Sequence, residues 1–128
     1  MKSSPWGAVQ NEKTIAPGVH FVSTARHGGM MISLALARKR LSVSAQTIGE
    51  NYGGYLCYEE DCAVAIPMLE AAEWREVGNS YDTEEHLIRT CASYYLPYLL
   101  EYLKSQGESL PDYAKESAGR YLEYHPVG

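Results

Sequence analysis

The chain has 128 residues, of which 45% are hydrophobic and 21% charged, and its formal net charge is −5 at pH 7. This composition excludes a disordered chain and suits one folded domain. No apolar run approaches the ~20 residues that span a bilayer, and none follows the first six residues, so we expect a cytoplasmic protein without a signal peptide.

The first half of the chain predicts a small antiparallel sheet. Residues 6–15 alternate weakly, whereas residues 19–25 alternate clearly and are rich in β-branched and aromatic side chains. The Ala-Pro-Gly sequence at residues 16–18 is typical of a turn, so these strands should form a hairpin. The remaining expectations are a third short strand from residue 30, a helix over residues 34–41, a polar loop over residues 42–54 and a last strand over residues 55–58.

The second half predicts helices. The acidic residues 59–61 should open the first of them, because carboxylates suit the unpaired N–H groups of a first turn. Pro67 either kinks this helix or lies in the first turn of a new one.

The most regular helical spacing covers residues 83–105. Asp82 and Glu85 resemble a capping pair at its start, and Pro97 should bend it. A final helix is expected within residues 110–124.

These elements predict an α+β fold in one domain, with a small N-terminal antiparallel sheet packed against C-terminal helices. Residues 1–58 are strand-rich and basic, and residues 59–128 are helical and acidic. Residues 1–49 carry six Lys and Arg and one acid, whereas residues 50–128 carry five Lys and Arg and fifteen acids. Either the two halves pack together and their fields partly cancel, or an acidic face is presented to a basic partner.

The three cysteines predict buried free thiols, because an odd number makes a poor disulfide framework. The spacing of Cys57 and Cys62 is marginal for a zinc pair, and His86 and Cys91 would point about 140° apart on a helix. Residues 59–61 would occupy consecutive helix positions and would not converge on a cation. We therefore expect neither a metal nor another cofactor.

A nucleophilic site is one possible use of His27, which two glycines follow. Cys57 or Cys62 would attack, and an acid from residues 59–61 would orient the imidazole. The structural alternative is that His27 shapes a turn and the acids begin a helix. The residues concerned are His27, Gly28, Gly29, Glu59, Glu60 and Asp61.

Direct binding of nucleic acid is not expected. Arg26, Arg38, Lys39 and Arg40 lie in a stretch without acids. The sequence pI of about 5.3, however, is far below the ~9 that is typical of nucleic-acid-binding domains.

Tyrosine is unusually frequent, with eleven Tyr against one Phe. Tyr gives rigid contact area with a hydroxyl that tolerates water, which favours interfaces. Tyr94, Tyr98 and Tyr102, beside Glu101, either form an exposed aromatic and acidic stripe or fill a small core.

Several motifs occur in a fixed order. They are Ser-Pro-Trp-Gly at residues 4–7, Ala-Pro-Gly-Val at 16–19, Ser-Thr-x-x-His-Gly-Gly at 23–29 and Tyr-Glu-Glu-Asp at 58–61. This succession resembles an uncharacterised domain of bacterial, plasmid and phage proteins over about residues 4–65, with Leu56 and Cys57 inserted between Gly-Gly-Tyr and the acidic motif. The resemblance implies no activity and no catalytic residues. It implies a setting among accessory proteins of mobile elements, some of which are similar to anti-CRISPR or anti-restriction inhibitors.

Two hypotheses follow. In the first, an acidic surface binds the basic surface of a nucleic-acid-handling protein of host defence, in the cytoplasm of a bacterial host. Its candidate contacts are Glu84, Glu85, Tyr94, Tyr98, Glu101 and Tyr102. In the second, the protein is a small enzyme or ligand-binding domain centred on His27 and residues 59–61. The sequence leaves the oligomeric state open.

Overall fold

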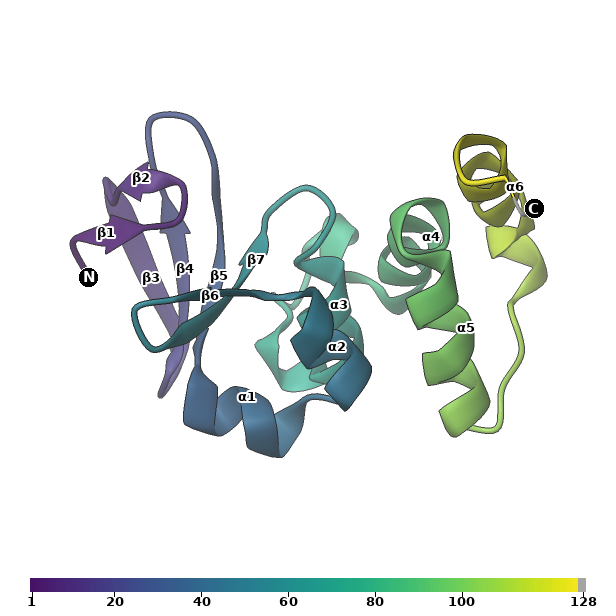
Figure 1. The fold of residues 1–128 in the computed structure, drawn as a ribbon, viewed down its shortest axis with the longest axis horizontal. Coiled ribbons are helices and arrows are strands. Elements are labelled where there is room, and N and C mark those ends of the chain that lie inside the picture. Colours follow the sequence, from purple (N-terminus) through teal and green to yellow (C-terminus); the bar gives the residue numbers. More distant parts are fainter. Residues whose placement is uncertain (127–128) are drawn as a thin grey trace. The chain divides into compact units, whose positions relative to one another are not determined.

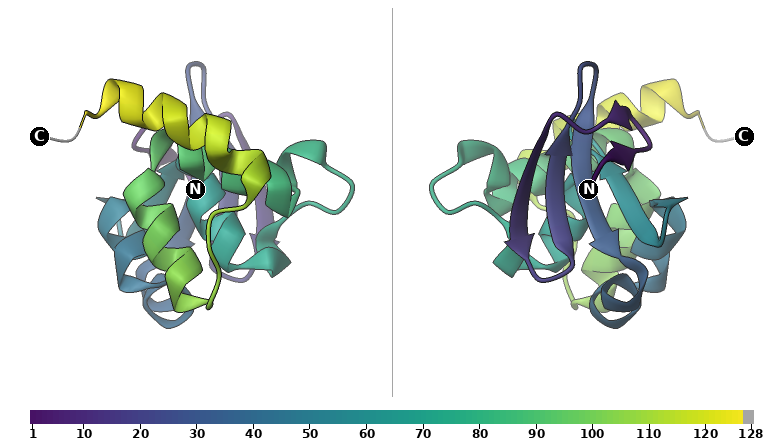
Figure 2. Two further views of the ribbon diagram at one scale, coloured as in Figure 1. Left: turned by 90° about the vertical axis from the view of Figure 1, so that its right-hand side faces the viewer. Right: turned by 90° about the vertical axis from the view of Figure 1, so that its left-hand side faces the viewer.

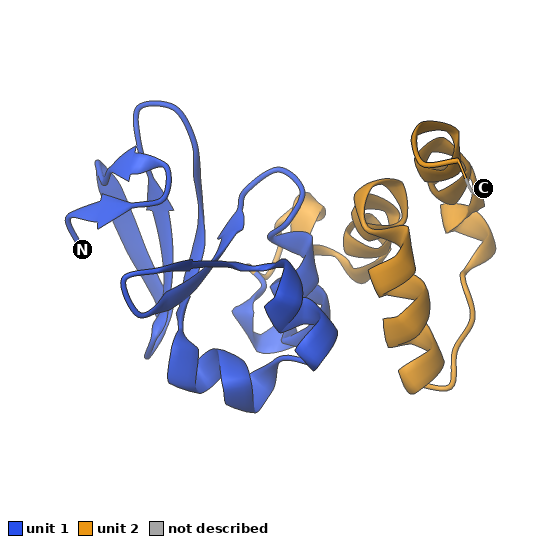
Figure 3. Ribbon diagram, viewed as in Figure 1, with its two compact units in different colours: residues 1–75 blue, residues 76–128 orange. Residues whose placement is uncertain are grey.

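A computed structural model describes residues 1–126 of the chain (Figure 1). Contacts divide the chain into two compact units, the sheet unit of residues 1–75 and the helical unit of residues 76–128 (Figure 3). Together the elements make an α+β fold, as the sequence predicts. No helix within residues 1–126 is long and apolar enough to cross a membrane.

The sheet unit holds one five-stranded antiparallel sheet and a separate two-stranded hairpin. The hairpin is β1 (Ser3–Ser4) and β2 (Gly7–Ala8). The larger sheet has the order β3-β4-β5-β7-β6, with β3 at Asn11–Ala16, β4 at Val19–Ser23, β5 at Gly28–Ser33, β6 at Glu50–Tyr52 and β7 at Tyr55–Glu59. The expected hairpin of β3 and β4 and the strands β5 and β7 are confirmed.

Short helices complete the sheet unit. They are α1 (Leu34–Arg40), α2 (Val43–Ile48), α3 (Ala65–Glu70) and the 3₁₀ turn η1 (Ala72–Trp74). Figures 1 and 2 show the β1–β2 hairpin on one face of the sheet and α2 and α3 on the other. The fully buried Met30, Ile32 and Tyr58 point to the helical face, because successive strand residues alternate between faces. The Tyr58 hydroxyl donates to the Ala45 carbonyl at 2.6 Å and so ties β7 to α2.

The expectation of a polar loop over residues 42–54 is wrong, because this segment contains α2 and β6. The hydrophobic pattern that would predict a helix is weak here, since α2 buries only Ala45. Ser42 caps α2 by accepting from the Ala45 N–H at 3.1 Å, and its own N–H and hydroxyl both donate to Glu70 at 2.7 Å. The polar residues of this segment therefore cap a helix and bond it to α3, and they do not form a solvated loop.

The acidic residues 59–61 do not begin a helix. Glu59 ends β7, Glu60 and Asp61 lie in a turn, and α3 begins only at Ala65 without a side-chain cap. The pairing of β7 with β5 continues through Glu59, so strand pairing overrides the local preference of acids for a helix start. Pro67 lies in the first turn of α3, which is the second of the two alternatives.

The helical unit contains η2 (Ser80–Asp82), α4 (Glu84–Tyr94), α5 (Leu96–Ser105), η3 (Asp112–Ala114) and α6 (Lys115–Tyr124). The expected single helix over residues 83–105 is wrong, because the chain breaks at Tyr95 and restarts with Pro97 in the first turn of α5. Thr83, not Asp82, caps α4 through the His86 N–H at 3.2 Å. The final helix is confirmed as α6.

One ion pair joins the end of α1 to η1 and gives a pH-dependent prediction. Arg40 donates twice to Glu73, at 2.6 and 2.8 Å, and this bonding lowers the pKa of Glu73 to about 2. Because the pKa in the folded protein lies below the unfolded value of ~4.3, the pair stabilises the fold above that pH, and its contribution is lost as the pH falls towards 2. Both side chains are largely exposed, which limits the stabilisation to about 0.5 kcal/mol.

We therefore expect Arg40→Gln to lower the free energy of unfolding by about 0.5 kcal/mol at pH 7 and by less at pH 3, measured by urea denaturation. Arg38→Gln, in the same helix, is the matched control and should have no such pH-dependent effect. An equal loss for Arg40→Gln at both pH values would contradict this account.

Candidate functional site

Gly28 and Gly29 lie where the backbone of β5 approaches its neighbours too closely for any side chain. A Cβ on Gly28 would clash with the Val22 carbonyl oxygen in β4. A Cβ on Gly29 would clash with the Tyr58 carbonyl oxygen in β7 and would lie 2.6 Å from the Trp6 ring. The two glycines are thus required by the packing of three strands and one indole.

The pairing of β5 with β7 brings together most of the residues of the second hypothesis. The Glu60 N–H donates to the Gly28 carbonyl at 2.9 Å. His27 Nδ1 lies 3.7 Å from Glu59 Oε1, with the two side chains 55% and 50% exposed. Asp61 is exposed in the turn that follows. The sequence motifs that are 30 residues apart therefore meet at one end of the sheet.

Cys57 does not fit the role of nucleophile that the second hypothesis allows. It is buried in β7, and burial, assisted by the Glu50 carboxylate, raises its thiol pKa to about 12. Such a thiol is uncharged at neutral pH and is a poor nucleophile. Within residues 1–126, no three His, Cys, Asp or Glu side chains are grouped so that they could hold a metal ion.

Thr24 ties the turn between β4 and β5 to the N-terminal hairpin. Its Oγ1 lies 2.7 Å from the His27 carbonyl oxygen and 3.3 Å from the Trp6 carbonyl oxygen, and it accepts from the N–H groups of Arg26 and His27 at 3.2 Å. One hydroxyl therefore holds both ends of this turn and the segment that covers the glycines. Trp6 itself packs against the core residues Val22, Met31 and Cys57.

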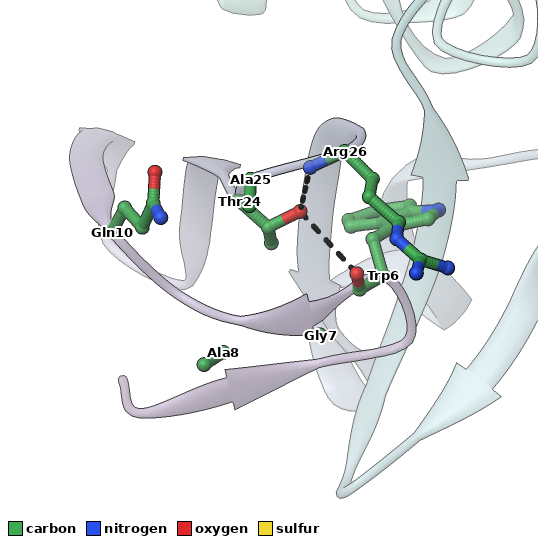
Figure 4. A pocket seen from close by; sticks show the side chains of 7 residues that line it. All are labelled: Trp6, Gly7, Ala8, Gln10, Thr24, Ala25 and Arg26. Atoms are coloured by element: carbon green, nitrogen blue, oxygen red, sulfur yellow. Dashed lines mark hydrogen bonds between the residues drawn. The ribbon is translucent and has the colours of Figure 1, made fainter.

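A surface pocket of about 320 Å³ lies between this turn and the N-terminal hairpin (Figure 4). Gly7 and Ala8 form one wall, and Thr24 and Ala25 form the other. Figure 4 shows Gln10 at one end of the pocket, and the other end is formed by Arg26 and Trp6. Sequence reasoning missed this pocket because its space is left open by small residues, whose side chains carry no functional group that would draw attention to them.

The four cations of residues 26–40 do not form one patch. Arg26 precedes β5, whereas Arg38, Lys39 and Arg40 lie in α1, which follows the other end of that strand. Six strand residues separate the two ends by roughly 20 Å. Arg40 is also paired with Glu73.

The helical unit carries the whole net charge of the protein. Residues 76–128 contain nine Asp and Glu and four Lys and Arg, whereas residues 1–75 contain seven of each kind. Glu84 and Glu85 are exposed in the first turn of α4, where the helix dipole favours them. Burial raises the pKa of Tyr113, and the negative charges of these two carboxylates add to that rise. The two carboxylates therefore lie near the Tyr113 ring, over which the Arg89 guanidinium packs.

Tyr94, Tyr98 and Tyr102, which form either an exposed stripe or a small core in the sequence analysis, do not lie on one helix. Tyr94 ends α4 and is 57% exposed, whereas Tyr98 in α5 is only 5% exposed and stacks on Tyr102 with ring centroids 6.2 Å apart. Tyr98 therefore serves the core of the helical unit. Glu101 is exposed on α5.

A loop that sequence reasoning missed presents apolar side chains on the helical unit. Within residues 76–82, Val77 is 100% exposed and Tyr81 is 69% exposed. The only sequence signal here is Gly78-Asn79, a pair that is typical of a turn or of the end of a helix. Exposed residues of a loop show no periodicity that would identify them.

This loop is nevertheless well bonded internally. The Glu76 N–H donates to Asp82 Oδ2 at 2.7 Å, and the Tyr81 N–H donates to Asn79 Oδ1 at 2.9 Å. The Asp82 N–H also donates to the Asn79 carbonyl at 3.0 Å. Gly78 adopts a φ of 87°, which favours glycine. These bonds connect the residues on either side of Val77, whose side chain is fully exposed.

The close approach at Gly29 gives a second prediction. Gly29→Ala should lower the free energy of unfolding by about 2–3 kcal/mol, because the Cβ meets backbone and an indole that is itself held in place. The matched control is Gly119→Ala in α6, where a Cβ meets no atom within 4 Å and should stabilise the helix slightly. Chemical denaturation followed by circular dichroism measures both. Equal stability of Gly29→Ala and the wild type would disprove the packing role.

Comparison with known proteins gives a family match that covers almost all of the architecture described above. No curated protein and no solved structure matches the chain. A family model described as a domain of unknown function (DUF7007) matches residues 1–119, which extends well beyond the half of the chain covered by the motif resemblance. The match includes the sheet unit and most of the helical unit, and the chain therefore belongs to the DUF7007 family.

Proposed function

We propose that the protein acts by binding another protein, and that its helical unit docks onto a basic surface of that partner. The observation that carries this proposal is the loop of residues 76–82, which holds Val77 and Tyr81 in solvent within the unit that has the whole net charge. Aromatic side chains such as Tyr are enriched in the core of protein interfaces, and polar and charged side chains surround them at the rim.

The internal bonds of the loop favour tight binding. A loop that is already ordered loses little conformational entropy when a partner covers it. Val77 and Tyr81 would be buried in the interface. Tyr is enriched among the residues that dominate interface energy, and full burial of a Val side chain contributes about 1.5–3 kcal/mol. Glu84 and Glu85 follow directly in the chain and would form part of the charged rim.

The partner class follows from charge. Proteins that handle nucleic acids present clustered Lys and Arg to phosphates, and an acidic protein surface can occupy the same cluster. We propose an inhibitor of a host defence system of the CRISPR or restriction type. The support for this setting is the motif resemblance to accessory proteins of mobile elements, together with the acidic helical unit.

The second hypothesis, a small enzyme or ligand-binding function of the sheet unit, remains a candidate. One observation favours it, namely the contact of His27 with Glu59 beside Glu60 at one end of the sheet.

The test begins with capture of partners from a bacterial lysate by the tagged full-length protein at low and at high salt. The captured partner is identified by mass spectrometry and purified, and its affinity for each variant is measured. We expect Val77→Ser to weaken binding by about tenfold, because the variant loses an apolar anchor. Val43→Ser is the matched control, since Val43 is also highly exposed but lies in the sheet unit, and it should bind like the wild type.

Charge reversal tests the acidic rim separately. The double variant Glu84→Lys and Glu85→Lys should bind more weakly, with the larger loss at low salt, because screening already reduces the attraction at high salt. Glu50→Lys in the sheet unit is the control. Capture that is insensitive to salt and to both sets of variants would contradict the proposal.

A further inference from the structure

We propose that the pocket between the N-terminal hairpin and the turn of residues 24–27 binds a nucleotide-like ligand, with an anionic group at Arg26 and a flat hydrogen-bonding group towards Gln10. This inference depends neither on protein binding by the helical unit nor on the pair of His27 and Glu59, which does not line the pocket. The volume of the pocket, about 320 Å³, lies at the lower end of the ~300–1,000 Å³ that is typical of small-molecule sites.

Arg26 supplies the anion-binding end. No carboxylate in the described part of the chain is ion-paired with its guanidinium, and Arg26 is exposed on the turn. Glu12 is engaged by the N-terminal ammonium at 3.1 Å and by His20 at 3.6 Å, and Glu59 faces His27. A guanidinium offers a planar fork of donors that matches a phosphate or carboxylate.

The backbone at this end is already fixed. The Arg26 N–H donates to Thr24 Oγ1 at 3.2 Å, and the same hydroxyl is within hydrogen-bonding distance of the Trp6 carbonyl. These bonds hold the turn and the Trp6 segment together, as Figure 4 shows. Trp6 beside Arg26 also brings an indole to the anion-binding end. A ligand would therefore meet a cation on a preorganised support.

Gln10 supplies the opposite end. Its backbone N–H donates to the Ser23 carbonyl at 2.9 Å, which fixes its position just before β3. Its exposed side-chain amide both donates and accepts, as the edge of a heteroaromatic base does. Between the ends, Gly7 and Ala8 leave the space open, and Gly7 has a φ of 123° that favours glycine. An anion joined to a flat polar ring fits this arrangement.

The experiment is a titration of the full-length protein followed by ¹⁵N-resolved NMR, with dissociation constants from calorimetry. The probes are adenosine 5′-monophosphate, inorganic phosphate and a six-nucleotide single-stranded DNA. We expect adenosine 5′-monophosphate to shift the backbone signals of Ala8, Ala25 and Arg26 and the side-chain amide of Gln10. Tighter binding of the oligonucleotide than of the mononucleotide would assign the ligand to a nucleic-acid strand, and the reverse would assign it to a free nucleotide.

Three variants decide the outcome. Arg26→Gln should weaken binding of adenosine 5′-monophosphate by about tenfold or more, because a charged hydrogen bond is lost. Gln10→Leu should weaken it less and leave phosphate binding unchanged. Arg38→Gln, an exposed cation beyond the other end of β5, is the control and should have no effect.

Two results would overturn the proposal. The first is the absence of shifts at the pocket with all three probes while the protein remains folded by the same spectra. The second is binding of inorganic phosphate as tight as that of adenosine 5′-monophosphate together with no effect of Gln10→Leu, which would leave only a non-selective cation at Arg26.

Discussion

The sheet unit depends on the close approach of β5 to the strands on either side. At Gly28 and Gly29 the carbonyl groups of β4 and β7 and the Trp6 ring occupy the space that a side chain would need. This contact allows β5 to lie in the centre of the sheet and the N-terminal hairpin to cover one face. Because the hairpin, the turn and β7 all meet here, the candidate ligand pocket and the pair of His27 and Glu59 lie around the same point.

Much of the fold could be predicted because its signals are local. The Ala-Pro-Gly turn and the alternation after it gave the first hairpin, and the spacing beyond residue 110 gave the last helix. Errors arose where a distant contact overrides local preference and where a proline breaks a helix instead of bending it. Glu59 extends a strand because Gly29 pairs with it, and Pro97 ends one helix and starts another. Pairing with β5 determines the conformation of Glu59, and the missing N–H of Pro97 determines where the helix breaks. Local propensity does not include pairing with a distant strand.

The site residues divide in the same way. His27, Glu59 and Glu60 could be grouped from motifs, and the β5–β7 register does bring them together. Tyr98 could not be assigned to core or surface, because the burial of an aromatic residue in a short helix depends on packing that spacing alone does not define. Val77 carried no signal at all, since its importance rests on exposure and on the hydrogen bonds of its neighbours.

The unequal distribution of charge has a consequence for the rate of association. The sheet unit has no formal net charge, so the long-range field of the protein arises from the helical unit. In the proposed complex, a basic partner would be drawn towards that unit before any contact forms, and this attraction would raise the association rate. Val77 would act only after contact, at short range, and would therefore govern how long the proposed complex lasts. Recognition and residence would thus be assigned to different residues of a single unit of the chain.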